Sequence, residues 1–216
     1  MSFNLAAFAA ECHVADPAGF AERCGTLRVF LEETNGKINL TRIAGEEDFA
    51  VKHVADSLSI ARFFPEIAEK TLEIADIGCG AGFPSLVLAM AYPRLRVTAI
   101  DSTGKKAAFV GEAAKLLHLK NLKPIHGRAN ELNRKAEFAK KFDIVTARAV
   151  APAETILRDC RNFPARGGRF ILYQSPERAE TDSGSLKLPV RCRITPAFDL
   201  PCNAGRRCFL EIALQT

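Results

Sequence analysis

The segment that most constrains this chain is residues 72–84, Leu-Glu-Ile-Ala-Asp-Ile-Gly-Cys-Gly-Ala-Gly-Phe-Pro. An apolar run typical of a buried strand ends at residue 77, three glycines follow at alternate positions, and residues 85–91 then have helical apolar spacing. Glycine permits a positive φ and lets a ligand approach main-chain N–H groups that no Cβ covers. The segment therefore predicts a strand, a tight turn and a helix start, which together favour a polar or anionic ligand.

The spacing of the glycines narrows the class of ligand. A dinucleotide fingerprint would need a third glycine at position 83, which is Phe83, and no Gly-Lys-Ser/Thr follows as a phosphate-binding P-loop requires. The remaining pattern, Asp76-x-Gly78-x-Gly80-x-Gly82, resembles the cofactor loop of the class I S-adenosylmethionine (SAM) methyltransferases. The residues alone leave one alternative open, which is a glycine-containing turn in an α/β fold that binds no ligand.

A second acid supports the SAM interpretation. Asp101 ends the next apolar segment, 25 residues after Asp76. A carboxylate at the carboxyl end of a strand, beside the switch point of an open sheet, can accept both ribose hydroxyl protons. We therefore expect Asp101 at the ribose, and the resemblance implies that Asp76 lies near the amino-acid end of the cofactor.

The rest of the chain after residue 71 alternates between strand and helix patterns. Strands are predicted over 72–77, 95–100, 122–126, 142–147 and 169–174, helices over 83–91, 104–117, 129–139 and 153–161, a mobile loop over 176–187, and two final strands over 190–198 and 206–214. Such alternation predicts an α/β fold with a mostly parallel seven-stranded sheet, of the Rossmann-like SAM-dependent methyltransferase type. Residues 71–216 form this predicted core.

Residues 1–70 are predicted to form a short N-terminal helical cap on the core, within one compact unit. Apolar residues have helical spacing over 3–12 and 17–33, the second of which ends at Asn35-Gly36, and a third helix is expected from about 47 to 64. On that third helix His53, Asp56 and Ser57 fall at i, i+3 and i+4, so they share one face.

Composition and charge limit the partners. The chain has no 18-residue apolar run and no basic signal-peptide start, so we expect no membrane span and a cytoplasmic location. Seven cysteines without a Cys-x-x-Cys pair predict reduced thiols and no metal site.

The charge is unevenly distributed along the chain. Residues 1–70 carry 7 Lys/Arg against 11 Asp/Glu, a net −4, whereas 71–216 carry 23 against 14, a net +9. The basic core favours a polyanionic partner, although basic solvated faces also occur in proteins that bind no nucleic acid.

Further stretches give the resemblance more detail. They are Asn39-Leu-Thr41, Lys52-His-Val-Ala-Asp-Ser57, Gly78-x-Gly-x-Gly-Phe-Pro84, Asp101-Ser-x-Gly-Lys-Lys106, Gly127-Arg-Ala129, Ala147-Arg-Ala149 and Gly167-Gly168. Their order and separations resemble the RsmG (GidB) family of bacterial 16S ribosomal RNA guanine-N7 methyltransferases over about residues 20 to 175. The resemblance implies cofactor contacts at Gly78, Phe83, Ala129, Asn130 and Arg148. Two residues depart from the family pattern, because Asn130 replaces an acid and Gln174 replaces a lysine.

The resemblance implies methyl transfer from SAM to N7 of a guanine in 16S ribosomal RNA or the small subunit, by a chain that we expect to be a monomer. Guanine N7 carries an exposed lone pair, so no residue is assigned as a general base, and His53, Lys105 and Arg148 are the candidate substrate-binding residues. For His53 and Asp56, a structural pair that ties the cap to the core is the alternative. Two other functions stay open: a SAM-dependent methyltransferase of a small molecule or protein, and a non-catalytic SAM-binding RNA module.

Overall fold

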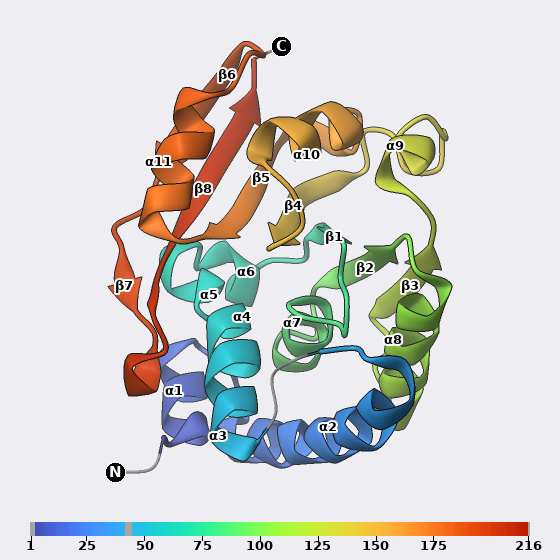
Figure 1. Ribbon diagram of the computed structural model, residues 1–216, viewed down its shortest axis with the longest axis vertical. Coiled ribbons are helices and arrows are strands. Elements are labelled where there is room, and N and C mark those ends of the chain that lie inside the picture. Colours follow the sequence, from blue (N-terminus) through green and yellow to red (C-terminus); the bar gives the residue numbers. More distant parts are fainter. Residues whose placement is uncertain (1–2, 42–44, 216) are drawn as a thin grey trace.

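A computed structural model describes residues 3–41 and 45–215. Its centre is a twisted sheet with strand order β3-β2-β1-β4-β5-β8-β6, and the two-residue β7 pairs with β8 outside this path (Figure 1). The strands are β1 (Glu73–Ile77), β2 (Arg96–Asp101), β3 (Leu122–His126), β4 (Phe142–Arg148), β5 (Pro164–Gln174), β6 (Val190–Ile194), β7 (Phe198–Asp199) and β8 (Arg206–Leu214). The first five run parallel, whereas β8 is antiparallel to both of its neighbours. The predicted mostly parallel, seven-stranded α/β sheet is therefore confirmed along this path.

The pleat of the sheet divides the interior into two cores. Ile74 and Ile144 belong to one hydrophobic cluster, and their chain neighbours Ala75 and Val145 belong to the other. The first cluster joins the sheet to the N-terminal helices and to α7 (Ser85–Ala91) and α8 (Gly104–Leu116). The second joins it to α9 (Ala129–Leu132), α10 (Ala153–Cys160) and α11 (Pro176–Gly184). Helices thus cover both faces, as a parallel sheet requires.

The N-terminal helices pack on the first face and share its core. They are α1 (Leu5–Glu11), α2 (Pro17–Ile38), α3 (Glu46–Asp48), the π-helix η1 (Phe49–Ala55), α4 (Asp56–Leu58), α5 (Ile60–Phe63) and α6 (Glu66–Glu69). Phe20, Leu27 and Leu58 are each fully buried in the same cluster as the strand residue Ile74. Figure 1 shows α2 along one side of the molecule, with α7 between it and the sheet.

Helix α2 runs past the point where we predicted that it ends. Asn35 does not break it, because the Asn35 side chain accepts from Thr41 N at 2.9 Å and donates to Thr41 O at 2.9 Å. The helix ends instead at Asn39, which has φ 50° and donates its N–H to Asn35 O. The predicted break at Asn35-Gly36 is wrong, because the Asn35 side chain hydrogen-bonds to the main chain of Thr41, beyond the end of the helix.

The predicted third helix of the cap is present but not regular. It is divided into α3, η1, α4 and α5, and the π-helical turn spans Phe49–Ala55. A π-turn widens the helix and changes which side chains align, and such turns are frequent at functional sites. His53 lies in this turn and Asp56 directly after it.

Three later elements differ from their predicted forms. Helix α9 ends at Leu132 rather than near 139, because Asn133 turns its side chain and its carbonyl to Asn162. Strand β5 begins at Pro164, five residues before the predicted start at 169. The predicted strand 190–198 is split into β6 and β7 around Pro196, which has no N–H for a ladder hydrogen bond.

The predicted mobile loop 176–187 is wrong, since most of it is helix α11. Ser175 caps this helix by accepting from Arg178 N, Pro176 occupies its first turn, and Ala179 and Asp182 are buried against the second core. The sequence Ser175-Pro-Glu177 is a typical helix start, and the prediction of a loop overlooked this signal. The described residues also contain no helix long and apolar enough to cross a membrane.

Candidate functional site

The glycine loop leaves the carboxyl end of β1 and leads into α7. Gly78, Gly80 and Gly82 have φ values of 66°, 58° and 87°, which side-chain-bearing residues rarely adopt. At Gly78 a Cβ would also lie 2.6 Å from Cγ2 of Val150, which follows β4. Glycine at position 78 is therefore required both by the turn and by the close approach of the loop after β4.

Asp101, at the end of β2, holds this loop in place. Its Oδ2 accepts from Gly80 N at 2.9 Å and its Oδ1 accepts from Thr103 N at 2.8 Å, and the residue is 6% exposed. Each carboxylate oxygen can accept a second hydrogen bond. Asp101 therefore fixes the loop geometry and retains acceptor capacity toward a ligand on the loop.

Asp76 lies beneath the loop and is 1% exposed. It accepts from both the N–H and the Oγ–H of Ser85 at the start of α7, and its Oδ1 accepts from Oγ1 of Thr146 at 3.0 Å. Burial raises the pKa of Asp76 to about 6, against the opposing effect of these hydrogen bonds. The side chain joins β1, α7 and β4 instead of reaching the ligand side of the loop.

Two cavities meet at Gly78. The first, here called the β3 cavity, has about 350 Å³ and is lined by Ile77, Gly78, Ile100, Ser102, Gly127, Arg128, Ala129, Asn130 and Val150 among others. The second, the cap cavity, has about 330 Å³ and is lined by Gly78, Gly80, Phe83, Thr41, Lys52, His53, Asp56, Arg148 and Arg207 among others. Gly78 is the lining residue that the two cavities share.

The two cavities suit the two ends of SAM. The β3 cavity has apolar walls from Ile77 and Ile100 for an adenine and an amide at Asn130 that can bond its polar edge. The cap cavity is lined by the glycine main chain at Gly78 and Gly80, whose polar groups suit a polar amino-acid group. These donor and acceptor sets fit SAM. Within the described residues no group of three or more His, Cys, Asp or Glu side chains could hold a metal ion.

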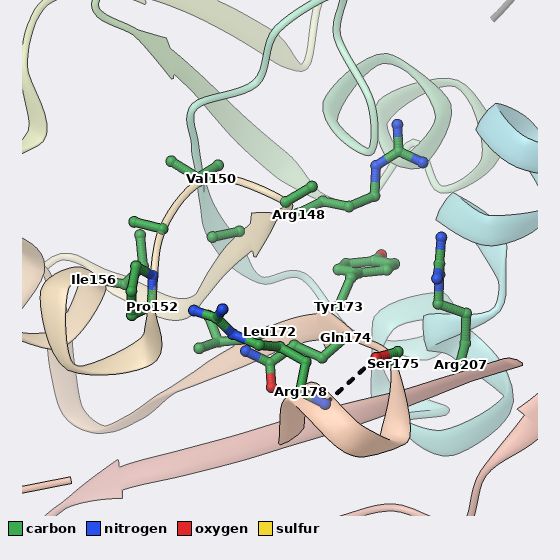
Figure 2. A pocket seen from close by; sticks show the side chains of 13 residues that line it. Arg148, Val150, Pro152, Ile156, Leu172, Tyr173, Gln174, Ser175, Arg178 and Arg207 are labelled. Atoms are coloured by element: carbon green, nitrogen blue, oxygen red, sulfur yellow. Dashed lines mark hydrogen bonds between the residues drawn. The ribbon is translucent and has the colours of Figure 1, made fainter. Parts of the chain in front are cut away.

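A third cavity of about 530 Å³, the β5 cavity, opens at the ends of β4 and β5 (Figure 2). It shares Val150, Ala151 and Ile156 with the β3 cavity, and Arg148, Ala149 and Arg207 with the cap cavity. Figure 2 shows Arg148 and Arg207 pointing toward the cap helices, whereas Arg178 points the other way. The β5 cavity thus borders both candidate cofactor cavities and carries three arginines.

The segment between these cavities is strained and exposed. Ala149 has φ 55°, which is uncommon for a residue with a Cβ, and Val150 exposes 44% of its surface. The unusual backbone directs the chain sharply from β4 toward α10. An apolar side chain is thereby presented at the opening of the β5 cavity, where an unstacked ring could pack on it.

Arg148 joins the carboxyl end of β4 to the cap. Its Nη1 donates to Lys52 O at 2.9 Å and to Asp56 Oδ2 at 3.0 Å, and its Nη2 donates to His53 Nδ1 at 3.1 Å. The Arg148 side chain is 15% exposed and that of Asp56 is 1% exposed. The guanidinium therefore binds the cap, and the structure brings Arg148 together with His53 and Asp56, which the sequence analysis had placed on one helix face.

The imidazole of His53 connects this cluster to the glycine loop. Its ring stacks on Phe83 with centroids 4.1 Å apart and an interplanar angle of 11°, and its Nε2 lies 3.1 Å from Thr41 Oγ1. Because a guanidinium only donates, Nδ1 must be the acceptor, so the neutral ring carries its proton on Nε2. Burial, and secondly the charge of Arg148, lower the pKa of His53 to about 3. His53 is thus neutral and hydrogen-bonded on both nitrogens.

Arg207, on β8, was missed by the sequence analysis. Its Nε donates to Asp56 Oδ1 at 3.0 Å, so Asp56 lies between two arginines from different strands. No local pattern around position 207 indicates this contact, because the partner is 151 residues away along the chain. Only the antiparallel return of β8 beside β5 brings the two residues together.

Arg178 was missed because α11 was predicted as a loop. Buried Asp182 accepts from Arg178 Nε at 3.0 Å, from Gln174 Nε2 at 2.7 Å and from Ala153 N at 3.0 Å. Arg178 is 47% exposed, and its guanidinium lies over the β5 cavity (Figure 2). Gln174, where the resemblance anticipated a lysine, therefore connects β5 to α11 through Asp182.

The other predicted residues divide into two groups. Gly78, Gly80, Phe83, Ala129, Asn130, His53 and Arg148 line the cavities. Asp76, Gly82 and Asp101 are not among the lining residues of these two cavities: the carboxylates of Asp76 and Asp101 hydrogen-bond to the loop and its flanks, and Gly82 belongs to the turn itself. Lys105 is exposed at the start of α8 and is not among the residues that line the three cavities.

Comparison with known proteins identifies the family. A family model described as rRNA small subunit methyltransferase G (GidB) matches residues 24–189. The chain belongs to this family. A ribosomal RNA small subunit methyltransferase G from Brevibacillus brevis is 39% identical over 181 residues, covering 82% of this chain and 75% of that protein. One from Limosilactobacillus reuteri is 40% identical over 187 residues, covering 84% and 78%.

A solved structure agrees with the fold of this methyltransferase G family member. The crystal structure of a SAM dependent methyltransferase from Aquifex aeolicus matches with a TM-score of 0.53 and 14% identity, covering 70% of this chain and 87% of that chain. At this identity the likeness shows the fold alone. The predicted class I methyltransferase fold and the predicted family are confirmed, and with them SAM as the cofactor.

Proposed function

We propose that this chain transfers a methyl group from SAM to N7 of a guanine in the 16S RNA of the small ribosomal subunit. Family membership supports the RNA of the small subunit as the substrate. The similar proteins from Brevibacillus brevis and Limosilactobacillus reuteri are both named ribosomal RNA small subunit methyltransferase G. We also propose that the enzyme acts as a monomer in the cytoplasm, on RNA or on the assembled subunit.

The observation that carries this proposal is the position of the β5 cavity. It shares lining residues with both candidate cofactor cavities, so a base within it would be adjacent to the point where they meet. Arg178 and Arg207 supply cations for an RNA phosphate, and exposed Val150 supplies an apolar surface for an unstacked base. An exposed, cationic opening suits a large polyanion better than a small molecule enclosed under a lid.

The proposed cofactor contacts are the residues at the two cofactor cavities. Ala129 and Asn130 would border the adenine, Asp101 would accept from the ribose, and the main chain at Gly78 and Gly80 would bind the amino-acid part. Asp76 would act indirectly by holding α7 and β4 against the loop. Bound SAM supplies a sulfonium methyl, which is a strong electrophile.

Guanine N7 needs no proton removed before it attacks, so the task of the protein is to position the two reactants. Holding them in line at near-attack distance is worth up to about 7–11 kcal/mol. Arg148 would act as a positioning residue: it fixes His53, and His53 stacks on Phe83 beside the glycine loop. Neutral His53 places no additional positive charge near the base, which becomes cationic on methylation.

The test uses small subunits from cells that lack the enzyme, together with 16S RNA freed of protein. Each is incubated with labelled SAM and the enzyme, and the RNA is then treated with borohydride and aniline, which cut the chain only at N7-methylated guanine. We expect label in RNA and a single new scission site. Label without scission would indicate another atom, and absence of label despite measurable SAM binding would favour a small-molecule or protein substrate or a non-catalytic module.

A further inference from the structure

A basic groove lies at the amino ends of the strands, opposite the proposed active site. It has about 600 Å³ and is lined by Thr71, Glu73, Pro93, Arg94, Leu95, Arg96, Val97, Thr98, Lys120, Asn121, Leu122, Lys123 and Lys141. Five of these side chains are cationic and only Glu73 is acidic. We call it the strand-start groove.

Most of its positive charge is not neutralised by carboxylates. Arg96 pairs with Glu73 at 3.2 Å, and Arg94 donates to the main-chain oxygen of Glu69. Lys120, Lys123 and Lys141 are exposed, and none of the three forms an ion pair with any residue that the structure describes. Three lysines that converge on one groove without counter-charges produce a local positive potential that attracts polyanions.

The floor of the groove is rigid. The side chain of Asn121 donates to Ala89 O at 3.0 Å and to Leu95 O at 3.1 Å, and its own main-chain oxygen accepts from Val97 N at 2.8 Å. These bonds fix the turn between α8 and β3 against the start of β2. The groove therefore exists before any partner binds, and its charges need little rearrangement to meet one.

The groove lies at the amino ends of the strands and the proposed active site at their carboxyl ends, so the two are separated by the length of a strand. Arg96 begins β2 and Asp101 ends it, so these residues are about 17 Å apart along a strand that rises about 3.3 Å per residue. A single nucleotide in the β5 cavity cannot also occupy the groove. A partner that contacts both must be long or folded around the protein, which is a property of ribosomal RNA.

We propose that the strand-start groove binds the phosphate backbone of a second segment of the RNA substrate, separate from the segment that carries the target guanine. The inference rests on the proposed function for the identity of the RNA. Lys123 lies on the edge strand β3, and a charged edge residue also hinders aggregation between sheets. That role accounts for one lysine but not for Lys120 and Lys141, which lie outside the strand.

The test compares two charge-reversal variants that change the net charge equally. Lys120→Glu/Lys123→Glu alters the groove and leaves the edge strand charged, whereas Lys187→Glu/Arg191→Glu alters exposed cations near and on β6, at the other end of the sheet. Binding of 16S RNA is measured by filter retention over a range of salt, and SAM affinity reports whether each variant is folded. Binding requires no catalysis, so this measurement is independent of whether methyl transfer occurs.

We expect the groove variant to bind 16S RNA at least tenfold more weakly at low salt, with unchanged SAM affinity. The slope of log affinity against log salt should fall by about 1.4, since each phosphate contact to a single strand contributes about 0.7. Equal losses in both variants, or no loss in the groove variant, would overturn the groove proposal even if wild-type enzyme methylates RNA. Failure of wild-type methyl transfer, with the groove-specific loss intact, would instead overturn the proposed function.

Discussion

Arg148 Nη2 donates to Nδ1 of His53 across 3.1 Å, and this hydrogen bond joins the end of β4 to the π-helical turn of the cap. Because His53 also stacks on Phe83, the cap contacts the glycine loop through the same imidazole. The alternative interpretation of His53 and Asp56, a structural connection between cap and core, is therefore what the geometry supports, with Arg148 as the intermediary. A role in positioning the cofactor loop is compatible with it.

The lowered pKa of His53 predicts a pH dependence of stability. Its pKa is about 3 in the folded protein and 6.5 ordinarily, so below pH 6.5 the unfolded chain binds a proton that the folded chain does not. This group therefore lowers the free energy of unfolding as the pH falls from 6.5 toward 3, by on the order of 1 kcal/mol per pH unit. Urea unfolding of wild type and His53→Gln over this range measures the effect.

Asp76 has the opposite effect on the pH dependence of stability. The effect of His53 is therefore measured as the difference between wild type and His53→Gln. Its pKa rises from 3.8 to about 6 on folding, so between these values the folded chain binds the extra proton and is stabilised as the pH falls. Asp76 is present in both proteins, and its effect cancels in the difference. Parallel stability curves for wild type and His53→Gln would show that His53 is not buried in its neutral form.

Substitution of Gly78 should weaken cofactor binding through two separable causes. Gly78→Ala places a Cβ 2.6 Å from Val150 and imposes a strained φ of 66°, so we expect SAM affinity to fall more than tenfold. Adding Val150→Ala removes the contact but not the backbone strain, so the double variant should recover only part of the affinity. Calorimetric titration of SAM measures both.

The control for this experiment is Gly36→Ala in α2, where a Cβ would meet no atom within 4 Å. This variant should bind SAM like wild type. Wild-type affinity in Gly78→Ala would remove Gly78 from the proposed cofactor site.

Loss of Arg148 should destabilise the protein, because Asp56 would remain buried with Arg207 as its remaining cationic partner. We expect Arg148→Ala to lower the free energy of unfolding by about 2–4 kcal/mol, somewhat less than removal of the sole partner of a buried charge. The matched control is Arg158→Ala, whose side chain is 70% exposed and should change stability by less than about 0.5 kcal/mol. Equal stabilities of the two variants in urea would contradict the proposed connection between core and cap.

Arg178 should affect RNA rather than the cofactor. Its Nε is held by Asp182 while its exposed part borders the β5 cavity, so Arg178→Ala should raise the KM for small subunits about tenfold and leave SAM affinity unchanged. Asp182 keeps its hydrogen bonds from Gln174 and Ala153, which limits the structural damage. Steady-state methyl transfer measures the KM, with exposed Arg191→Ala as the control. A change in SAM affinity would place Arg178 at the cofactor instead.

The local elements that were predicted correctly are those whose patterns are complete within a few residues. Strand β1, the three glycines and the start of α7 depend on adjacent residues, and strands β2 and β4 are buried along most of their length, so their apolar runs are clear. Several errors fall where a partner outside the local pattern decides the outcome, whereas the split at Pro196 had a local cause. Asn35 is held by Thr41, Asn133 turns to Asn162, and Asp182 anchors a helix in a segment that is polar enough to resemble a loop.

By itself, the sequence determined the α/β architecture, the glycine loop and the family, and it proposed most of the residues that line the candidate site, because periodicity, glycine spacing and short motifs are local properties. Only the tertiary structure decided how those residues are used. Asp76 is buried under the loop, and Arg148 reaches Asp56 of the cap. Arg207 reaches the same Asp56 from a strand 151 residues away along the chain. The directions of these side chains depend on which strands become neighbours in the sheet, and on the need of each buried charge for a partner.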